Sequence, residues 1–161
     1  MIIGIDPGCS GAIAVISEAG EYISHQIMPV MKVGKGNRVN GAALAAFLRE
    51  QLCQHSVDGC HAYLERVGAM PGQGVTSMFT FGHAAGVAEG VLQGLGIPYT
   101  LITPQSWKKT SGLIGKDKDA ARTRAIQLYP GLRILDLKGK GQAVADAILI
   151  ARQAASGVAH G

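Results

Sequence analysis

Three acidic residues that lie far apart in the sequence have the types and positions needed for metal-assisted chemistry. Asp6 and Glu65 each end a short apolar segment, and Asp146 is the only acid of a long apolar stretch. With no histidine or cysteine at ligand spacing, these carboxylates are hard oxygen ligands suited to Mg²⁺ or Mn²⁺. Two such ions about 3.5–4 Å apart activate water on one side of a phosphorus and stabilise the leaving oxygen on the other. The chemistry indicated is phosphodiester hydrolysis.

The segment around Asp6 predicts a β-hairpin. Apolar runs at 1–5 and 12–16 flank a turn that contains Pro7 and Gly8, a pattern typical of paired strands. Asp6 would then lie at the tip of a central buried strand, where glycines let a phosphate approach. Asp-Pro-Gly is also favoured in ordinary turns, so this stretch alone fits turn chemistry equally well.

The strand that ends at Glu65 is predicted to lie beside the strand that ends at Asp6. Asn40 caps a predicted helix over 41–54, which leads through a glycine-containing turn into a strand over 60–65. Strand, helix and strand in succession imply a crossover connection and a parallel pair. The two carboxylates are therefore expected at the same edge of the sheet.

The third acid lies in a predicted helix from 142 to about 155. This segment is apolar on nearly every side, so the helix is expected to pack on more than one face. Burying an unpaired carboxylate costs several kcal/mol, so Asp146 needs a cation or strong donors. Ala145 and Ala147 let the helix approach the sheet closely.

The rest of the sequence predicts further elements. A strand is expected at 21–28, antiparallel to the second strand, and another at 98–102. Residues 29–39 are expected to form a flexible basic loop, which is either a solvated connection or a phosphate contact. Thr103–Trp107 is expected as a turn, and a helix is predicted from 117 or 118 to 129.

A predicted helix over 76–95 carries glycines four residues apart. Each glycine costs about 1 kcal/mol relative to alanine in a helix, so close packing is expected to compensate. The packing partner is either the sheet of the same domain or the same helix of a second copy of the chain.

Composition indicates one compact domain over residues 1–161. The chain is 47% hydrophobic and 16% charged, which is ordinary for a globular domain. It has no apolar run near the ~18 residues of a membrane span and no basic leader, so a cytoplasmic protein without membrane contact is expected. A net charge of +4 is compatible with a nucleic-acid partner.

Three motifs together resemble the RuvC family of Holliday junction resolvases, within the RNase H-like nuclease superfamily. They are Gly4-Ile-Asp6-Pro-Gly8, Leu64-Glu65-Arg66 and Ala145-Asp146-Ala147-Ile-Leu-Ile-Ala151, and the similarity extends from residue 1 to about 155. The short form, with Thr103-Pro-Gln-Ser-Trp107-Lys-Lys, is more similar to phage-borne or prophage members. The resemblance implies an α/β fold, with a five-stranded mixed β-sheet flanked by α-helices. It also implies a homodimer that nicks two opposed strands of a four-way DNA junction.

The resemblance implies roles for individual residues as well. Asp6 would bridge Mg²⁺ ions, for which Mn²⁺ can substitute, with Glu65 and Asp146 completing the site. Lys108 and Lys118 fall where family members carry lysines near the scissile phosphate, although each also fits a solvated surface lysine. Further DNA contacts are expected from basic and apolar residues: Lys109, Lys116, Arg122, Lys138, Lys140, Met70 and Phe79.

Two departures from the family pattern bear on these roles. Members usually carry Asp or His one helical turn before the last acid, and here Ala143 holds that place, next to Gln142, whose carbonyl could bind metal. The loop after Glu65, where relatives place an aromatic wedge, contains no aromatic residue. Met70 or Phe79 would have to act as the wedge.

Three alternatives stay open on the sequence. The acids also fit a branch, flap or fork nuclease of the same fold. The missing fourth ligand leaves room for a junction-binding module without catalysis. The segment from Gly4 to Gly11 also resembles the first phosphate loop of sugar-kinase and actin-like ATPases, but those proteins need two such domains to close over a nucleotide.

Overall fold

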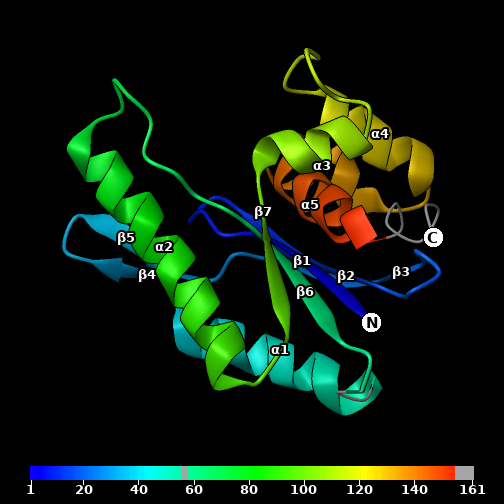
Figure 1. The fold of residues 1–161 in the computed structure, drawn as a ribbon, viewed down its shortest axis with the longest axis horizontal. Helices are drawn as coiled ribbons and strands as arrows, with labels where there is room; N and C mark the ends of the chain where they lie inside the picture. The colour runs from blue at the N-terminus through cyan, green and yellow to red at the C-terminus, as the bar shows by residue number, and fades with distance from the viewer. Residues whose placement is uncertain (56–57, 155–161) are drawn as a thin grey trace.

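The computed structural model describes residues 1–55 and 58–154 and is built on a five-stranded β-sheet (Figure 1). The strands are β1 (Ile2–Asp6), β2 (Ala12–Ile16), β3 (Tyr22–Ile27), β6 (His61–Glu65) and β7 (Tyr99–Ile102). Their order across the sheet is β3-β2-β1-β6-β7. β2 is antiparallel to both of its neighbours, whereas β1, β6 and β7 are parallel. This is the mixed five-stranded sheet that the sequence predicts.

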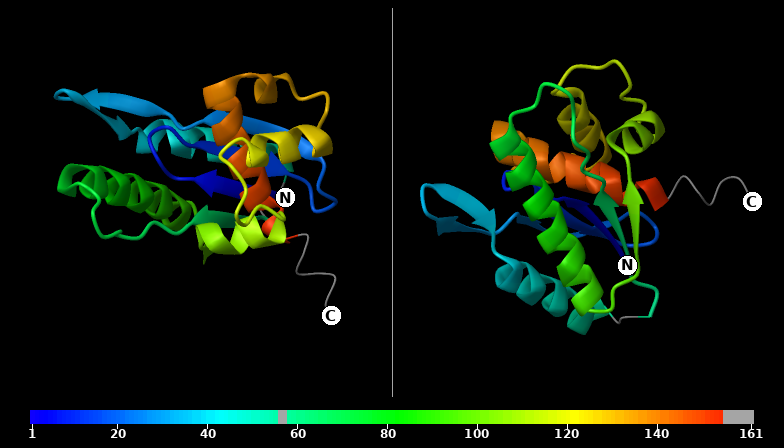
Figure 2. Two further views of the ribbon diagram at one scale, coloured as in Figure 1. Left: turned by 90° about the horizontal axis from the view of Figure 1, so that it is seen from above. Right: turned by 60° about the vertical axis from the view of Figure 1, so that its left-hand side comes forward.

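Helices cover both faces of the sheet, as Figure 1 and Figure 2 show. They are α1 (Gly41–His55), α2 (Val75–Gly94), α3 (Pro104–Thr110), α4 (Ala120–Leu128), the 3₁₀ turn η1 (Arg133–Asp136) and α5 (Lys138–Ala151). α1 and α2 pack on one face, and α5 packs on the other, with α3 and α4 against it. Within the described ranges, no helix has the length and apolarity that a bilayer span requires.

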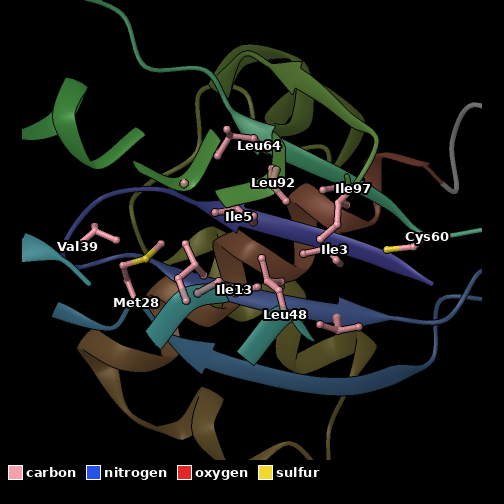
Figure 3. Close-up of a cluster of buried hydrophobic side chains, with 14 of the residues drawn as sticks. Ile3, Ile5, Ile13, Met28, Val39, Leu48, Cys60, Leu64, Leu92 and Ile97 are labelled. Carbon is pink, nitrogen blue, oxygen red and sulfur yellow. The ribbon is translucent and has the colours of Figure 1, made fainter. Parts of the chain in front are cut away.

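Alternation along the central strands divides their side chains between two cores. Ile3 and Ile5 of β1 and Ile13 of β2 are fully buried in the core beneath α1 and α2 (Figure 3), where they meet Leu48 and Leu92. The side chains between these isoleucines face α5. One face of β1 therefore packs into the core beneath α1 and α2, and the other face, toward α5, carries the candidate site.

The helix predicted after Asn40 forms as expected. The Asn40 side-chain oxygen accepts a hydrogen bond of 3.1 Å from the backbone N–H of Ala43, which satisfies one of the free donors at the start of α1. Leu44 and Leu48 are completely buried on the face that meets the sheet. α1 then returns the chain to the start of β6, as a crossover between parallel strands requires.

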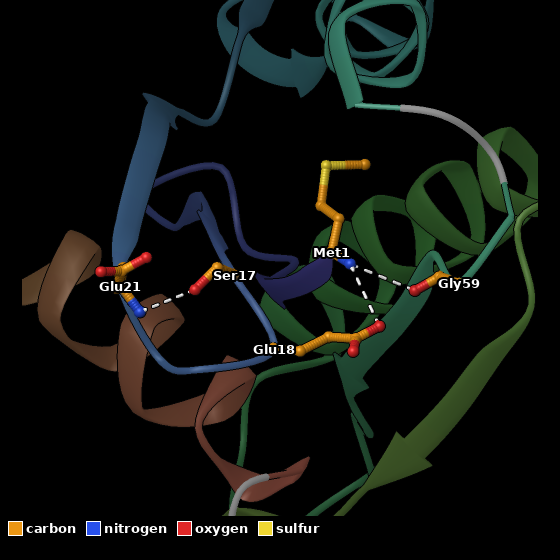
Figure 4. Close-up of polar contacts among 5 residues, drawn as sticks. All are labelled: Met1, Ser17, Glu18, Glu21 and Gly59. Carbon is orange, nitrogen blue, oxygen red and sulfur yellow. Dashed lines mark hydrogen bonds and ion pairs between the residues drawn. The ribbon is translucent and has the colours of Figure 1, made fainter.

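Polar contacts close the edge of the sheet where β1 and β6 begin (Figure 4). The amino group of Met1 donates a hydrogen bond of 3.1 Å to the Gly59 carbonyl and lies 3.8 Å from the Glu18 carboxylate. The Ser17 hydroxyl accepts a hydrogen bond of 3.0 Å from the N–H of Glu21. The acids that end β1 and β6 lie at the opposite edge.

The segment 29–39 is a β-hairpin, so the prediction of a flexible loop is wrong. β4 (Val30–Val33) and β5 (Gly36–Val39) pair antiparallel outside the main sheet. Gly34 has a φ of 60°, a value that glycine adopts without steric cost in the two-residue turns of hairpins. A glycine-led pair between two short valine-containing runs is the signal that identifies such a hairpin.

Thr103–Trp107, expected as a turn, instead begins α3. The Thr103 hydroxyl accepts a hydrogen bond of 3.1 Å from the N–H of Ser106, and Pro104 occupies the first helical turn, where its missing N–H costs nothing. These are the features of a helix start. They were open to a turn interpretation because Thr, Pro and Ser are common in both.

α4 and α5 also begin at other residues than predicted. α4 starts at Ala120 rather than 117 or 118, because the Asp117 carboxylate accepts a hydrogen bond of 3.0 Å from the N–H two residues later and forms a turn. α5 starts at Lys138, four residues before the predicted 142. Gly141 permits this start, since a Cβ there would lie 2.7 Å from a carbonyl oxygen of η1. The predicted end near 155 lies outside the described residues.

The glycines of α2 do not pack on the sheet. Among the described residues, no atom outside the adjoining backbone of the helix lies within 4 Å of a Cβ built on Gly82, Gly86, Gly90 or Gly94. The side of α2 that faces the core carries Ala84, Ala88 and Leu92. Packing of the glycines on the domain's own sheet, one of the two explanations expected from the sequence, is therefore wrong.

Candidate active site

Asp6 ends β1 and points to the face of the sheet that α5 covers. Because side chains alternate along a strand and Ile3 and Ile5 face α1 and α2, Gly4 and Asp6 face α5. The Asp6 carboxylate accepts a long hydrogen bond of 3.4 Å from the N–H of Gly8. The turn after β1 thus helps to orient this side chain at the edge of the sheet.

Small residues let α5 lie directly on β1. A Cβ at Gly4 would collide with the carbonyl oxygen of Ala147 and would lie 2.9 Å from the Cβ of Ala151, so only glycine fits at this position. Two alanines of β2 are buried under the same helix. This close approach, which the alanine-rich sequence of α5 predicts, brings Asp146 beside the end of β1.

Glu65 ends β6, the neighbour of β1, and α3 holds its carboxylate. The indole N–H of Trp107 donates a hydrogen bond of 2.8 Å to Glu65 Oε1, and Trp107 is only 2% exposed. The ammonium group of Lys108 lies 5.4 Å from the centre of the Trp107 ring, within the range of a cation–π contact. Two consecutive residues of α3 therefore determine the environment of Glu65.

The three carboxylates lie close enough to repel one another. Burial, followed by the charge of Glu65, raises the pKa of Asp6 to about 6. Burial, followed by the charge of Asp6, raises the pKa of Asp146 to about 7. Burial also raises the pKa of Glu65, although the hydrogen bond from Trp107 and the charge of Lys108 oppose this. Acids from β1, β6 and α5 therefore share one electrostatic environment.

Gln142 lies one helical turn before Asp146 and contacts it directly. Its side-chain N–H donates a hydrogen bond of 2.9 Å to Asp146 Oδ1. Its own carbonyl oxygen is buried and has no hydrogen-bond partner among the described residues. Ala143, at the place expected for a fourth ligand, is 6% exposed and offers no donor atom. The free carbonyl oxygen of Gln142 is the additional oxygen that α5 presents here.

The donor set of this site fits a hard divalent cation. Three carboxylates and an unpaired amide oxygen offer only oxygen ligands, which Mg²⁺ and Mn²⁺ prefer, and a cation would relieve the repulsion among the acids. In the part of the chain that the structure describes, no three His, Cys, Asp or Glu side chains converge into a preformed metal-binding cluster. Metal binding therefore requires the acids to turn toward a common ion.

Two pockets flank the acidic residues. One, of about 500 Å³, lies between the β1–β2 turn and α2 and is lined by Asp6 and Glu65. The other, of about 380 Å³, lies between α5 and the loop of residues 111–119 and is lined by Asp146. The lysines that line this second pocket are Lys108, Lys116 and Lys118. Lys118 was predicted to begin the helix, but it lies in the loop before α4.

The other basic residues expected to contact DNA are spread over several elements. Lys109 is exposed on α3, and Lys138 and Lys140 are exposed at the start of α5. Arg122 is half-buried, and its guanidinium donates a hydrogen bond of 3.1 Å to the Leu135 carbonyl. Arg122 therefore connects α4 to η1.

The two candidate wedge residues lie on the α2 side of the site. Met70, in the loop before α2, is 67% exposed, and Phe79, on α2, is 61% exposed. The guanidinium of Arg38, from β5, lies 5.4 Å from the centre of the Phe79 ring. Phe79 is thus accessible but already has a cationic neighbour.

Sequence reasoning missed two contributors to this region. The sequence predicts Trp107 only as part of a turn, and nothing in it indicates a hydrogen bond to Glu65, 42 positions away. The hairpin that presents Arg38 was missed as well, although Gly34 and Lys35 between two short valine-containing runs are a hairpin signal.

No model of a known protein family matches the sequence. The chain is 32% identical over 123 residues to "Holliday junction resolvase MOC1, chloroplastic" of Chlamydomonas reinhardtii. This alignment covers 76% of the chain but only 14% of that protein. The chain therefore corresponds to a small part of this relative.

Two solved structures have a similar fold. The RuvC of T. thermophilus in complex with a Holliday junction substrate superposes with a TM-score of 0.67 at 16% identity, covering 99% of this chain and 96% of that one. A second Thermus thermophilus RuvC structure gives a TM-score of 0.52 at 17% identity, covering 94% and 91%. At these identities, the two likenesses establish the fold.

Proposed function

We propose that the chain is a RuvC-like protein and a structure-selective endonuclease, because it shares the fold of RuvC and is 32% identical over 123 residues to part of a protein named as a Holliday junction resolvase. Its substrate is a four-way (Holliday) DNA junction, resolved by paired symmetric nicks through phosphodiester hydrolysis with two metal ions. It acts as a Mg²⁺-dependent crossover junction endodeoxyribonuclease, with Mn²⁺ able to substitute, in a single domain over residues 1–161.

The observation that carries this proposal is the gathering of three carboxylates at one edge of the sheet. Asp6, Glu65 and Asp146 come from three separate elements. Burial, with the charge of Glu65, raises the pKa of Asp6, and burial, with the charges of Asp6 and Glu65, raises the pKa of Asp146. Bound divalent ions would supply the Lewis acidity that activates water and stabilises the leaving oxygen. Asp6, Glu65 and Asp146 are the side chains that would hold these ions. Similarity to a protein named as a Holliday junction resolvase, and to a RuvC solved with such a junction, supports the choice of substrate.

Lys108 and Lys118 balance the charge of the scissile phosphate. Both line the pocket that contains Asp146. The charge of Lys108 opposes the rise that burial causes in the pKa of Glu65 and of Asp146. A lysine is a compact, mobile charge suited to following a phosphate. Gln142 orients Asp146 through its amide and offers its carbonyl oxygen to a metal ion.

The wider DNA contacts come from basic side chains around this pocket and from two exposed apolar residues. The basic residues are Lys109, Lys116, Lys138, Lys140 and Arg122. Arg122 contributes least, because its guanidinium is already engaged by a backbone carbonyl. Met70 and Phe79 are available to stack on junction bases.

The proposed enzyme is a homodimer, because paired nicks in two opposed strands need two active sites. The open row of glycines from Gly82 to Gly94 on α2 supports this assembly, since a second α2 packed against it would offset their cost in helix stability. The cytoplasmic location and the phage or prophage origin stay predictions of the sequence.

Cleavage of an immobile four-way junction tests the proposal. The labelled junction, a linear duplex and a flap are incubated in Mg²⁺ or Mn²⁺ with the wild type, with Asp146→Asn and with Glu50→Gln. Glu50 is an exposed acid of α1, so its variant removes one negative charge far from the site. We expect paired symmetric nicks in the junction from the wild type and from Glu50→Gln, and none from Asp146→Asn or in EDTA.

Two other outcomes would revise the proposal in different ways. Faster cleavage of the flap would replace the junction with a flap or fork substrate and leave the chemistry intact. Tight junction binding without cleavage in either metal would indicate a binding module that has lost catalysis. Ala143, in the place of a fourth ligand, is the observation that favours this second candidate function.

A further inference from the structure

The hairpin formed by β4 and β5 is a basic arm outside the main sheet. Its ten residues, 30–39, contain three basic side chains and no acid. Lys32 and Lys35 are exposed, and Arg38 is half-buried. Within the described residues, none of the three forms an ion pair. The arm therefore presents positive charge that nothing in the described chain neutralises.

Strand β5 of this hairpin contacts the turn that follows β1, beside the candidate active site. Cys9, in the turn after β1, lies with its Sγ 3.7 Å from the Asn37 carbonyl oxygen. The same Cys9 lines the pocket of about 500 Å³ that contains Asp6 and Glu65. The hairpin thus contacts a residue that lines the acidic pocket. It projects away from the main sheet beside α2, as Figure 1 and the right-hand view of Figure 2 show.

The geometry of the hairpin distributes its charges over a wide surface. In the register of the two strands, Lys32 lies opposite Asn37 and Arg38 lies opposite Met31, so the lysine and the arginine project from opposite faces. Arg38 is held over the ring of Phe79 on α2. Lys35 occupies the tip of the turn, after Gly34.

The acidic residues lie between this hairpin and a second basic segment. On the α5 side, Lys116 and Lys118 of the loop 111–119 line the pocket of Asp146. Figure 1 shows the hairpin and the loop between α3 and α4 on opposite sides of the end of β1. A polyanion seated over the acids therefore meets positive charge on both sides.

We propose that the β4–β5 hairpin is a second phosphate-binding arm, which contacts the DNA backbone on the α2 side of the active site through Lys32 and Lys35. This inference rests on the proposed nuclease function. The occupant is nucleic acid because the arm carries only positive charge, whereas a two-fold contact with a second copy through this face would set like charges against each other. Contacts of this kind position a duplex and are independent of its sequence.

Removing the two lysines tests the role of the arm. Lys32→Gln/Lys35→Gln and the control Arg49→Glu both lower the net charge by two. Arg49 is exposed on α1, which leads to the start of β6, at the edge of the sheet opposite Asp6 and Glu65. Binding of a catalytically inactive Asp146→Asn background to the four-way junction is measured from 50 to 300 mM salt, and thermal unfolding checks that each variant folds.

We expect the hairpin variant to bind the junction about 10-fold more weakly than its parent near 0.1 M salt. The slope of log Kd against log salt should fall by about 1 to 2, since each lost phosphate contact removes about 0.9 for duplex DNA. Arg49→Glu should change neither value beyond about twofold. In the cleaving enzyme, the hairpin variant should raise KM and keep kcat.

Two results would overturn this inference, and they are distinguishable from each other. If the folded hairpin variant and Arg49→Glu give the same affinity and salt slope while the parent binds the junction tightly, the arm does not contact DNA. If the parent itself binds no DNA, the proposed function fails, and the hairpin inference fails with it.

Discussion

Two neutral side chains, Trp107 and Gln142, each donate a hydrogen bond to a carboxylate of the acidic site. The distances are 2.8 Å to Glu65 and 2.9 Å to Asp146. A donor that bonds a carboxylate favours its charged form, which is the form that binds a metal ion. Both residues therefore act through the acids, as positioning residues, and they oppose the effect of burial on the pKa values.

Replacing Trp107 with phenylalanine should separate this positioning role from packing. Phe retains most of the buried ring but loses the N–H, and a hydrogen bond to a charged group contributes about 1.5–3 kcal/mol. We expect Trp107→Phe to weaken Mn²⁺ binding and to slow junction cleavage by about 10-fold or more. The loss of Mn²⁺ affinity and of cleavage rate should shrink as pH rises. The pKa of Glu65 is expected to be higher in the variant, so a higher pH is needed to ionise this carboxyl group. Calorimetric Mn²⁺ titration and single-turnover cleavage from pH 6 to 9 measure these effects.

Tyr99→Phe is the matched control for this variant. Tyr99 donates a hydrogen bond of 2.7 Å from its hydroxyl to the Glu89 carboxylate, between β7 and α2, so the change also removes one aromatic donor to a glutamate. It should leave Mn²⁺ binding and the pH profile unchanged. An equal loss in both variants, or unchanged Mn²⁺ affinity in Trp107→Phe, would rule out a positioning role for Trp107.

The raised pKa values of the acids predict how stability depends on pH in the metal-free protein. Asp146 has a pKa of about 7 and Asp6 of about 6, against an ordinary value of 3.8. The folded state therefore binds more protons than the unfolded state between about pH 4 and 7, so the free energy of unfolding falls as pH rises through this window. In EDTA, we expect the protein to be less stable at pH 8 than at pH 5, by on the order of 1 to 3 kcal/mol from these groups.

Urea unfolding of the wild type and of Asp146→Asn at both pH values measures this effect. In Asp146→Asn, the free energy of unfolding should decrease much less between pH 5 and pH 8 than in the wild type. In Glu50→Gln, it should decrease as much as in the wild type. His25, whose pKa is lowered by burial, contributes equally to all three proteins and cancels in the comparison. Adding Mg²⁺ at pH 8 should restore stability to the wild type. If the free energy of unfolding decreases equally in Asp146→Asn and in the wild type, the acidic site is not the cause of the pH dependence.

At the scale of elements, the sequence predicts the helices and strands whose signals lie within a few neighbouring residues. The hairpin of β1 and β2, the helix after Asn40 and the strand ending at Glu65 all follow from apolar periodicity and turn or cap residues within a few positions. The position of Asp6 and Glu65 at neighbouring strand ends follows from the crossover rule alone. For these two acids, the relative position in the sheet was therefore predictable from the sequence, and their role in a metal site stays a prediction.

The elements that were missed depend on contacts between distant residues. The start of α5 at Lys138 requires Gly141 to fit against the backbone of η1, and neither feature has a local signal. Likewise, the distance between Asp146 and Asp6 is set by the contact of Gly4 with Ala147. The sequence shows that these residues are small, but only the packed structure shows which of them meet.

At the scale of the whole molecule, two kinds of surface are available to partners: the basic segments and the open glycine face of α2. The basic hairpin and the basic loop 111–119 flank the acids, so in the proposed complex DNA would approach from the edge where β1 and β6 end. The glycine row of α2 covers about 18 Å along the helix, at 1.5 Å per residue from Gly82 to Gly94. Two helices in contact along such rows can approach closely.

Substituting one glycine of this row tests the dimer without disturbing the fold. A Cβ at Gly86 meets no atom of the described chain within 4 Å beyond the adjoining backbone of its own helix. Leucine favours a helix by nearly 1 kcal/mol over glycine, so Gly86→Leu should fold with unchanged or higher thermal stability. At a close helix contact, the added side chain should cost about 1–3 kcal/mol, which weakens the dimer by about 5- to 150-fold. Sedimentation velocity measures the dissociation constant, with Ala46→Leu on the exposed side of α1 as the control. The two nicks in a junction should then become independent events, because separate monomers make them; a dimer as tight as the wild type would place the interface elsewhere.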